Sequence, residues 1–177
     1  MNKDRENVLI GITVFLLYFV QSLFQDLPLR LIGIDYYQMS LSNKIIYLLS
    51  YEFIFILILF LIYRKKFAND FKDYIKNFKK YTKKYIEYWA LAFGLMILSN
   101  LVIVNVFPTS VATNQEAVNA IMNVAPLYMF ISAVIYAPII EETIFRLSIR
   151  NIFKNDTLFI IVSGLIFGGL HVIGSFE

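Results

Sequence analysis

The sequence contains no cysteine and a single histidine among its 177 residues. The absence of cysteine excludes disulfide bonds, thiolate catalysis and metal sites with cysteine ligands. One histidine excludes zinc sites built from several histidines, including the two-histidine helix motif of metalloproteases. Charged residues are scarce as well: they make up 16% of the chain, against about a quarter in soluble proteins. From these shortages we expect no cofactor, and a metal site is only weakly supported.

Apolar residues dominate what remains, with 59% hydrophobic and 17% aromatic residues. Such a chain cannot cover its own surface with polar groups, so the lipid bilayer is the expected solvent. Apolar runs predict about five membrane spans, at residues 8–24, 45–63, 89–107, 127–151 and 157–175. A cleaved signal peptide is the alternative for the first run, but no small-residue cleavage site follows it. We therefore expect an all-α, multi-pass transmembrane helical bundle that forms a single membrane domain over residues 1–177.

Basic residues are concentrated between the second and third predicted spans, from Arg64 to Tyr88. This segment contains nine of the 16 basic residues: Arg64, Lys65, Lys66, Lys72, Lys76, Lys79, Lys80, Lys83 and Lys84. Its aromatic residues recur at alternating steps of four and three, which places them on one face of a helix. The pattern predicts a basic amphipathic helix that lies on a leaflet of anionic lipid, and it does not favour nucleic acid. Because positive loops stay inside, we expect this segment and the N-terminus to be cytoplasmic, in a cell-membrane protein.

The segments between the other predicted spans carry turn and capping signals. Residues 27–43 contain Pro28 and Gly33 and are expected to form a loop. The spacing of Thr113 and Glu116 is that of a capping box, which predicts a short helix that runs to about residue 124. Asn155 stands in the turn before the last predicted span and is expected to help cap that span.

Ionisable residues inside the predicted spans are the candidates for function, because burying charge in a bilayer is costly. Glu141, Glu142, Arg146 and His171 all fall in the last two apolar segments. Glu52 lies in the second span, near the possible partners Tyr47, Ser50 and Tyr51. It is either a hydrogen-bonded group that faces other helices or a member of the site.

Helical spacing predicts which face of the predicted helix each of these candidates occupies. Glu142 and Arg146 are four residues apart, with the acid first, which is the favourable order for an ion pair. Glu141 falls on another stripe, which it shares with Ala133, Ala137 and Phe145. Pro138, one turn earlier, removes a backbone donor and should open the helix locally.

A second stripe of small residues lies on the last predicted helix and includes Gly164, Gly168 and His171, with Phe167 beside it. Small residues let helices approach closely in lipid, so the two stripes predict that the last two helices pack through them. This packing would bring Glu141 and His171 together. A carboxylate and an imidazole around one water molecule form a general-base pair.

At these residues the chain resembles the CPBP family of CAAX prenyl endopeptidases and bacteriocin-processing, Abi-type membrane proteins. That family has a Glu-Glu-x-x-x-Arg motif, matched by Glu141, Glu142 and Arg146, and a Phe-x-x-x-His motif, matched by Phe167 and His171. Both motifs stand on consecutive apolar helices, in the family's order.

The resemblance covers Leu127 to Glu177 and implies a glutamate-dependent intramembrane endopeptidase. It implies that Glu141 and His171 activate a water molecule and that Glu142 and Arg146 support them. The family's third motif, a histidine followed four residues later by asparagine or aspartate, is absent. We therefore expect either a fragment of a longer protease or a truncated relative that is not active alone.

The first functional hypothesis is hydrolysis of a peptide bond near the cytoplasmic side of the membrane, in a peptide or protein substrate. The alternative is a non-catalytic membrane protein that confers bacteriocin immunity or binds a membrane partner. A transporter is a third reading, which no repeated half of the sequence supports. Anionic lipid is the expected partner of residues 64–88.

Overall fold

The structure is a computed structural model that describes residues 3–106, 119 and 121–172; the side chains of His171 and of a few other helical residues lie outside this description. Every element in the described part is helical, which confirms the all-α fold class. The elements are α1 (Lys3–Leu23), α2 (Leu27–Leu31), η1 (Tyr36–Gln38), α3 (Leu41–Val106), α5 (Pro126–Phe130), η2 (Ile131–Tyr136), α6 (Ala137–Glu141), η3 (Glu142–Ser148), α7 (Ile149–Ile152) and α8 (Asp156–Val172).

In the part of the chain that the structure describes, three helices are long and apolar enough to cross a bilayer, by length and composition. They lie at Asp4–Leu23, Leu41–Ser99 and Pro126–Ile152. The apolar part of α8, Asp156–Leu170, is shorter than a full span. These helices and the apolar composition indicate a membrane protein, and the number of five spans stays a prediction.

The chain divides into two compact units. The first contains Met1–Ile62 and Thr113–Glu177, and the second contains Tyr63–Ala112. Helix α3 belongs to the first unit as far as Ile62 and to the second unit from Tyr63 onward. All the candidate site residues fall in the first unit.

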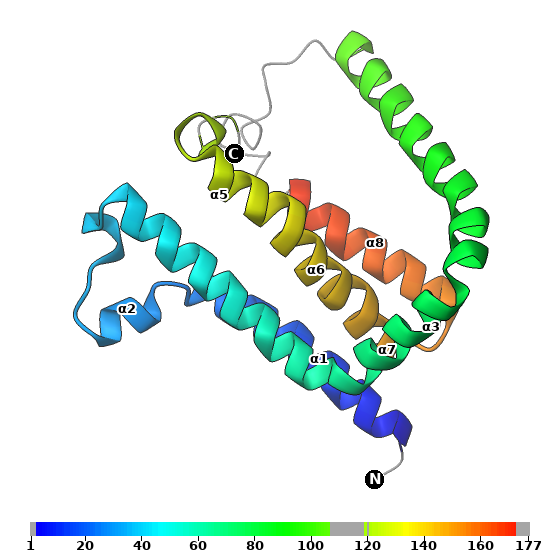
Figure 1. The fold of residues 1–177 in the computed structure, drawn as a ribbon, viewed down its shortest axis with the longest axis horizontal. Coiled ribbons are helices and arrows are strands. Elements are labelled where there is room, and N and C mark those ends of the chain that lie inside the picture. Colours follow the sequence, from blue (N-terminus) through cyan, green and yellow to red (C-terminus); the bar gives the residue numbers. More distant parts are fainter. Residues whose placement is uncertain (1–2, 107–118, 120, 173–177) are drawn as a thin grey trace. The chain divides into compact units, whose positions relative to one another are not determined.

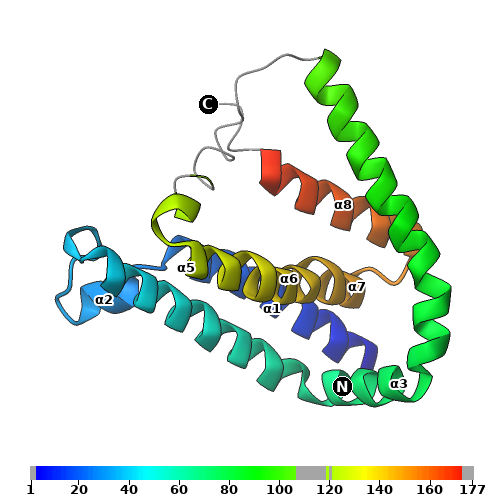
Figure 2. The same cartoon turned by 45° about the horizontal axis from the view of Figure 1, so that its top comes forward.

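In the first unit, α1 packs against η3 and α7, and α8 packs against the same two elements (Figures 1 and 2). The contact with α1 buries Val14, Ile144 and Ile149 almost completely. Gly11 allows the backbones to approach: a Cβ atom built on it would lie 2.6 Å from the carbonyl oxygen of Ser148. The helix that carries the paired glutamates is therefore held from both sides.

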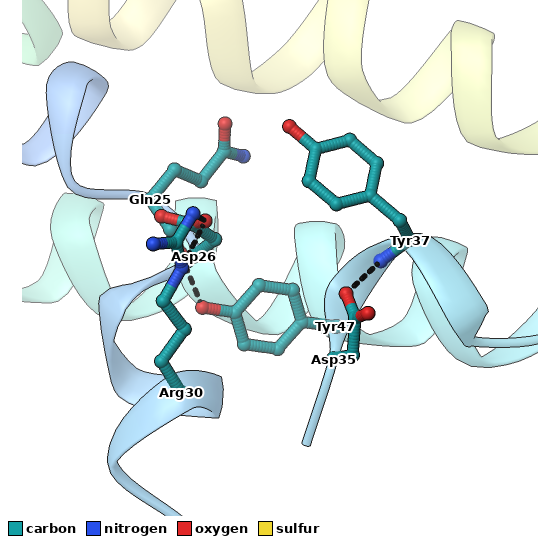
Figure 3. Close-up of polar contacts among 6 residues, drawn as sticks. All are labelled: Gln25, Asp26, Arg30, Asp35, Tyr37 and Tyr47. Atoms are coloured by element: carbon teal, nitrogen blue, oxygen red, sulfur yellow. Dashed lines mark hydrogen bonds and ion pairs between the residues drawn. The ribbon is translucent and has the colours of Figure 1, made fainter. Parts of the chain in front are cut away.

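The connection from α1 to α3 is more ordered than the predicted loop, because it contains α2 and η1. Pro28 lies in the first turn of α2, where its missing N–H costs nothing. Asp35 accepts a hydrogen bond of 2.9 Å from the backbone N–H of Tyr37 at the start of η1 (Figure 3). The hydroxyl of Tyr47 donates to the carbonyl of Gln25 and ties the start of α3 to this connection (Figure 3).

Helix α3 runs over 66 residues and joins what the sequence predicts as two spans and an interfacial helix. No glycine or proline interrupts residues 41–93, so nothing ends the helix there. Its one non-helical residue is Asn77, with φ −111° and ψ 15°. The side-chain amide of Asn77 donates to the carbonyl oxygen and to the carboxylate of Asp73, at 3.1 and 2.8 Å. This side chain inserts into the hydrogen-bond ladder and kinks the helix.

Of the two helix caps predicted from the sequence, one lies among the described residues. Asn155 accepts a hydrogen bond of 3.0 Å from the N–H of Leu158, which confirms its capping role at the start of α8. The capping box at Thr113 and Glu116 lies outside the described residues. Of the helix predicted to follow it, residues 121–124 are described and are helical.

Candidate functional site

The paired glutamates lie where two kinds of helix meet. Residues 126–152 form one continuous helix, in which Glu141 ends α6 and Glu142 begins η3. Both η2 and η3 are π-helical, so wider turns flank the α-helical segment that leads to Glu141. Such turns are rare in proteins as a whole, but those that occur are often at functional sites.

Pro138 lies in the first turn of α6 and explains part of this geometry. It has no N–H to donate, as the sequence analysis anticipates. Directly before it, the N–H of Ala137 donates to the carbonyl of Ser132, five residues back. The wider turn of η2 thus precedes the proline without breaking the helix.

Six of the eight residues singled out from the sequence line one pocket of about 500 Å³ between η3 and α8. They are Pro138, Glu141, Glu142, Arg146, Gly164 and Phe167. Phe145, Phe159, Ile160 and Ser163 complete the wall and were not singled out as site residues. We call this pocket the motif groove. It places carboxylates, a guanidinium and aromatic rings around one space.

The ion pair predicted from helical spacing is present. The Nε atom of Arg146 lies 3.2 Å from Oε2 of Glu142, and both side chains are more than half exposed on the protein. An exposed pair of this kind contributes little to stability, typically about 0–1 kcal/mol. Its value to the site is that it fixes a carboxylate and a cation side by side at the groove. Their catalytic role stays a prediction.

Helix α8 docks onto the motif helix through other residues than the predicted glycines. The hydroxyl of Ser163 donates to the carbonyl of Phe145 over 2.6 Å. The rings of Phe145 and Phe167 meet edge to face, with centroids 5.5 Å apart. No atom lies within 4 Å of a Cβ built on Gly164 or Gly168, in the part of the chain that the structure describes.

The prediction that the last two helices pack through these glycines is therefore wrong. The bulky ring pair lies in the contact and keeps the helices further apart than two glycine faces would. Gly164 instead lines the motif groove, where its missing side chain leaves room. Gly168 is not among the groove residues.

His171 lies in the last turn of α8, four residues beyond Phe167. This spacing puts it on the same side of the helix as Phe167, one turn further along. Its side chain lies outside the described residues, so the pairing of Glu141 with His171 stays a prediction. Among the side chains that are described, no three His, Cys, Asp or Glu groups come together as metal ligands.

Glu141 also lines a second pocket, of about 220 Å³, on the side of its helix that faces α1 and α3. Glu52 of α3 lies in this pocket and is half-buried. The hydroxyl of Ser132 lies 3.1 Å from both carboxylate oxygens of Glu52. We call this space the polar pocket.

The partner of Glu52 differs from the neighbours considered in the sequence. The hydroxyl of Ser50 bonds within its own helix to Ile46, and that of Tyr51 donates to the carbonyl of Gln21. Ser132 is separated from Glu52 by 80 residues, so no local spacing could have indicated it.

The stretch that lines the motif groove is similar to known proteins. Residues 123–177 match the family described as type II CAAX prenyl endopeptidase Rce1-like. The UPF0177 protein YaiH of Lactococcus lactis subsp. lactis (strain IL1403) is 40% identical over 65 residues. That match covers 37% of this chain and 28% of the relative, so the chain spans well under half of the relative's length. No solved structure matches significantly.

The matched residues contain both motifs and every residue of the motif groove. Over residues 123–177 the chain is therefore similar to the type II CAAX prenyl endopeptidases, and this similarity supports the resemblance to the CPBP family in that stretch.

Proposed function

We propose that the protein is an intramembrane endopeptidase of the CAAX-protease type, in which Glu141 and His171 activate a water molecule. The observation that carries the proposal is the motif groove, because it gathers Glu141, Glu142 and Arg146 around a space of about 500 Å³. Its apolar wall, with Phe145, Phe167 and neighbouring residues, suits an extended peptide in a lipid environment.

In this mechanism Glu141 is the general base. A lone pair of the water oxygen forms a bond to the carbonyl carbon of the peptide, the π pair moves onto the carbonyl oxygen, and the carboxylate of Glu141 takes the released proton. When the tetrahedral intermediate collapses, the C–N bond breaks and the proton passes to the leaving nitrogen. His171 orients the water or gives that nitrogen its proton, and Arg146 pairs with Glu142 beside the base.

Substitution of the base tests the proposal. We expect Glu141→Gln, in the protein expressed from its complete reading frame, to abolish cleavage of a peptide substrate in membranes. Glu87→Gln is the control, because Glu87 lies in the second unit and outside the groove. Unchanged cleavage by Glu141→Gln would refute the mechanism. Protection against a bacteriocin, or partner binding, that survives Glu141→Gln would favour the non-catalytic alternative.

We also propose that the basic part of α3, residues 64–88, binds anionic lipid on the cytoplasmic side of the cell membrane. Its lysines are exposed, and so are apolar side chains such as Phe71, Tyr74 and Phe78. The ammonium group of Lys84 lies 5.2 Å from the ring centre of Tyr85. Long lysine stems beside exposed rings suit the interface between headgroups and acyl chains.

Trp89 is the single tryptophan and adjoins this segment, so it can report on lipid. We expect stronger energy transfer from Trp89 to dansyl-labelled phosphatidylglycerol than to the phosphatidylcholine analogue. Changing Lys79, Lys80, Lys83 and Lys84 to glutamine should remove the preference, and high salt should weaken it. Lys44→Gln is the control in the first unit. Equal transfer to both lipids would refute this proposal.

A further inference from the structure

The polar pocket is lined mostly by groups that hydrogen-bond, although the segments that build it are predicted spans. It includes Gln21 and Ser22 of α1, Tyr51 and Glu52 of α3, Ser132 of η2 and Glu141 of α6. Polar side chains inside a membrane bundle face either other polar groups or a water-filled cavity. A space of about 220 Å³ between these groups has room for several water molecules.

The hydrogen bonds in the pocket hold its walls together and leave acceptors facing the space. The hydroxyl of Tyr51 donates 2.9 Å to the carbonyl of Gln21 and joins α3 to α1. Ser132 donates its one hydroxyl hydrogen to Glu52, whose two carboxylate oxygens have about four acceptor positions. Among the described lining residues there is no lysine, arginine or histidine. The acceptor positions of the two carboxylates are therefore open to water and to the hydroxyl and amide donors of the lining.

Among the described residues, Glu141 alone lines both pockets. The motif groove reaches it from the side of η3 and α8, and the polar pocket reaches it from the side of α1 and α3. A peptide that fills the apolar groove would exclude water there. A base in this position therefore needs its water from somewhere else.

We propose that the polar pocket is a water compartment. It supplies water to Glu141 from the side of α1 and α3 while the peptide occupies the motif groove on the other side. Glu52 is a positioning residue in this arrangement: held by Ser132, it anchors the water molecules that lead to Glu141. The supply role rests on the hydrolase function proposed above. The hydration of the pocket does not, and it can be measured without turnover.

The absence of cysteine makes the test direct, because every introduced thiol is unique. Ser132→Cys and Ala137→Cys place a thiol at the polar pocket. Val134→Cys and Ile135→Cys are matched controls between them, at exposed apolar positions outside the pocket. The four variants lie within six residues of one helix and so at nearly the same depth. Each is reconstituted in phospholipid vesicles and treated with a charged, water-soluble methanethiosulfonate reagent.

The thiolate attacks the sulfenyl sulfur of the reagent, forms a disulfide bond and displaces methanesulfinate. The thiolate itself forms in water and not in lipid. We expect Ser132→Cys and Ala137→Cys to react at least tenfold faster than Val134→Cys and Ile135→Cys. Equal rates at all four positions would overturn the proposal, because the pocket would then be as dry as the lipid-facing surface.

The supply role has its own readout. A labelled Ser132→Cys fills the compartment, so kcat for peptide cleavage should fall by at least tenfold with KM unchanged, while labelled Val134→Cys keeps its activity. Undiminished kcat after complete labelling of Ser132→Cys would overturn the supply role. If no variant cleaves before labelling, the proposed hydrolase function fails, and the labelling rates still decide whether the pocket is hydrated.

Discussion

Ser163 of α8 donates a hydrogen bond of 2.6 Å to the backbone carbonyl of Phe145 in η3. This bond joins two helices at the wall of the motif groove. It also fixes the ring of Phe145 against Phe167. This serine hydroxyl and this pair of rings are among the contacts that set the width of the groove.

Removal of this hydroxyl should loosen α8. We expect Ser163→Ala to lower the free energy of unfolding by about 1 kcal/mol, the usual worth of one hydrogen bond. Thermal unfolding in detergent, followed by circular dichroism, measures the change. Ser50→Ala is the control, because the hydroxyl of Ser50 bonds within its own helix to Ile46. If both variants unfold alike, the bond between α8 and η3 contributes nothing particular.

A methyl group at Gly11 should disturb the contact of α1 with η3 and α7. Its Cβ would lie 2.6 Å from the carbonyl oxygen of Ser148 and 3.0 Å from the Cβ of Asn151, so the helices must move apart. We expect Gly11→Ala to cost about 1–3 kcal/mol, in the range for overpacking. Gly94→Ala has open space around it and should be neutral or slightly stabilising in its helix. A stable Gly11→Ala would mean that the contact is looser than described.

A side chain at Gly164 should obstruct the motif groove without unfolding the protein. The position is open and lines the groove, so Gly164→Leu fits and fills it. We expect kcat/KM for a peptide to fall at least about tenfold, which equals about 1.4 kcal/mol, at unchanged thermal stability. Gly168→Leu is the matched control on the same helix, because Gly168 also has open space but does not line the groove. Equal losses in both variants would show that substrate binds elsewhere.

The kink in α3 should depend on Asn77. We expect Asn77→Leu to remove the amide that bonds to Asp73 and to straighten the second unit. Spin labels at Lys66→Cys and Tyr88→Cys report the change by electron paramagnetic resonance. Their separation should increase toward the rise of a straight helix over 22 residue steps, about 33 Å. Tyr81→Phe removes the other hydrogen bond to Asp73 and shows whether the hydroxyl contributes. An unchanged separation in Asn77→Leu would place the cause of the kink elsewhere.

Local spacing in the sequence was enough to predict several features of the site. The steps from Glu142 to Arg146 and from Asn155 to Leu158 are short-range, and both interactions are present. The two family motifs predicted a common site, and the motif groove brings most of their residues together. The cues for α2 and η1 were also present, in Pro28 and Asp35, although the segment was read as a loop.

Features that depend on tertiary contacts could not be predicted in this way. Nothing near Glu52 indicates Ser132, and no propensity scale indicates the wider turns of η2 and η3. Small residues in apolar runs were a correct signal of close helix packing, but they were assigned to the wrong glycines. Gly11 makes the close contact, and Gly164 keeps a space open. Spacing alone cannot distinguish these two uses of glycine.

The wider turns on either side of α6 have a consequence for how related sequences should be aligned. A π-helical turn accommodates one residue more than an α-helical turn, so residues 131–136 and 142–148 can each lose a residue by tightening to α-helix. Residues 137–141 are α-helical and cannot tighten in this way. A deletion there would rotate Glu141 about the helix axis by about 100°, the angle that one residue contributes to an α-helical turn. Gaps among homologues should therefore fall beside the proline and the first glutamate, and not between them.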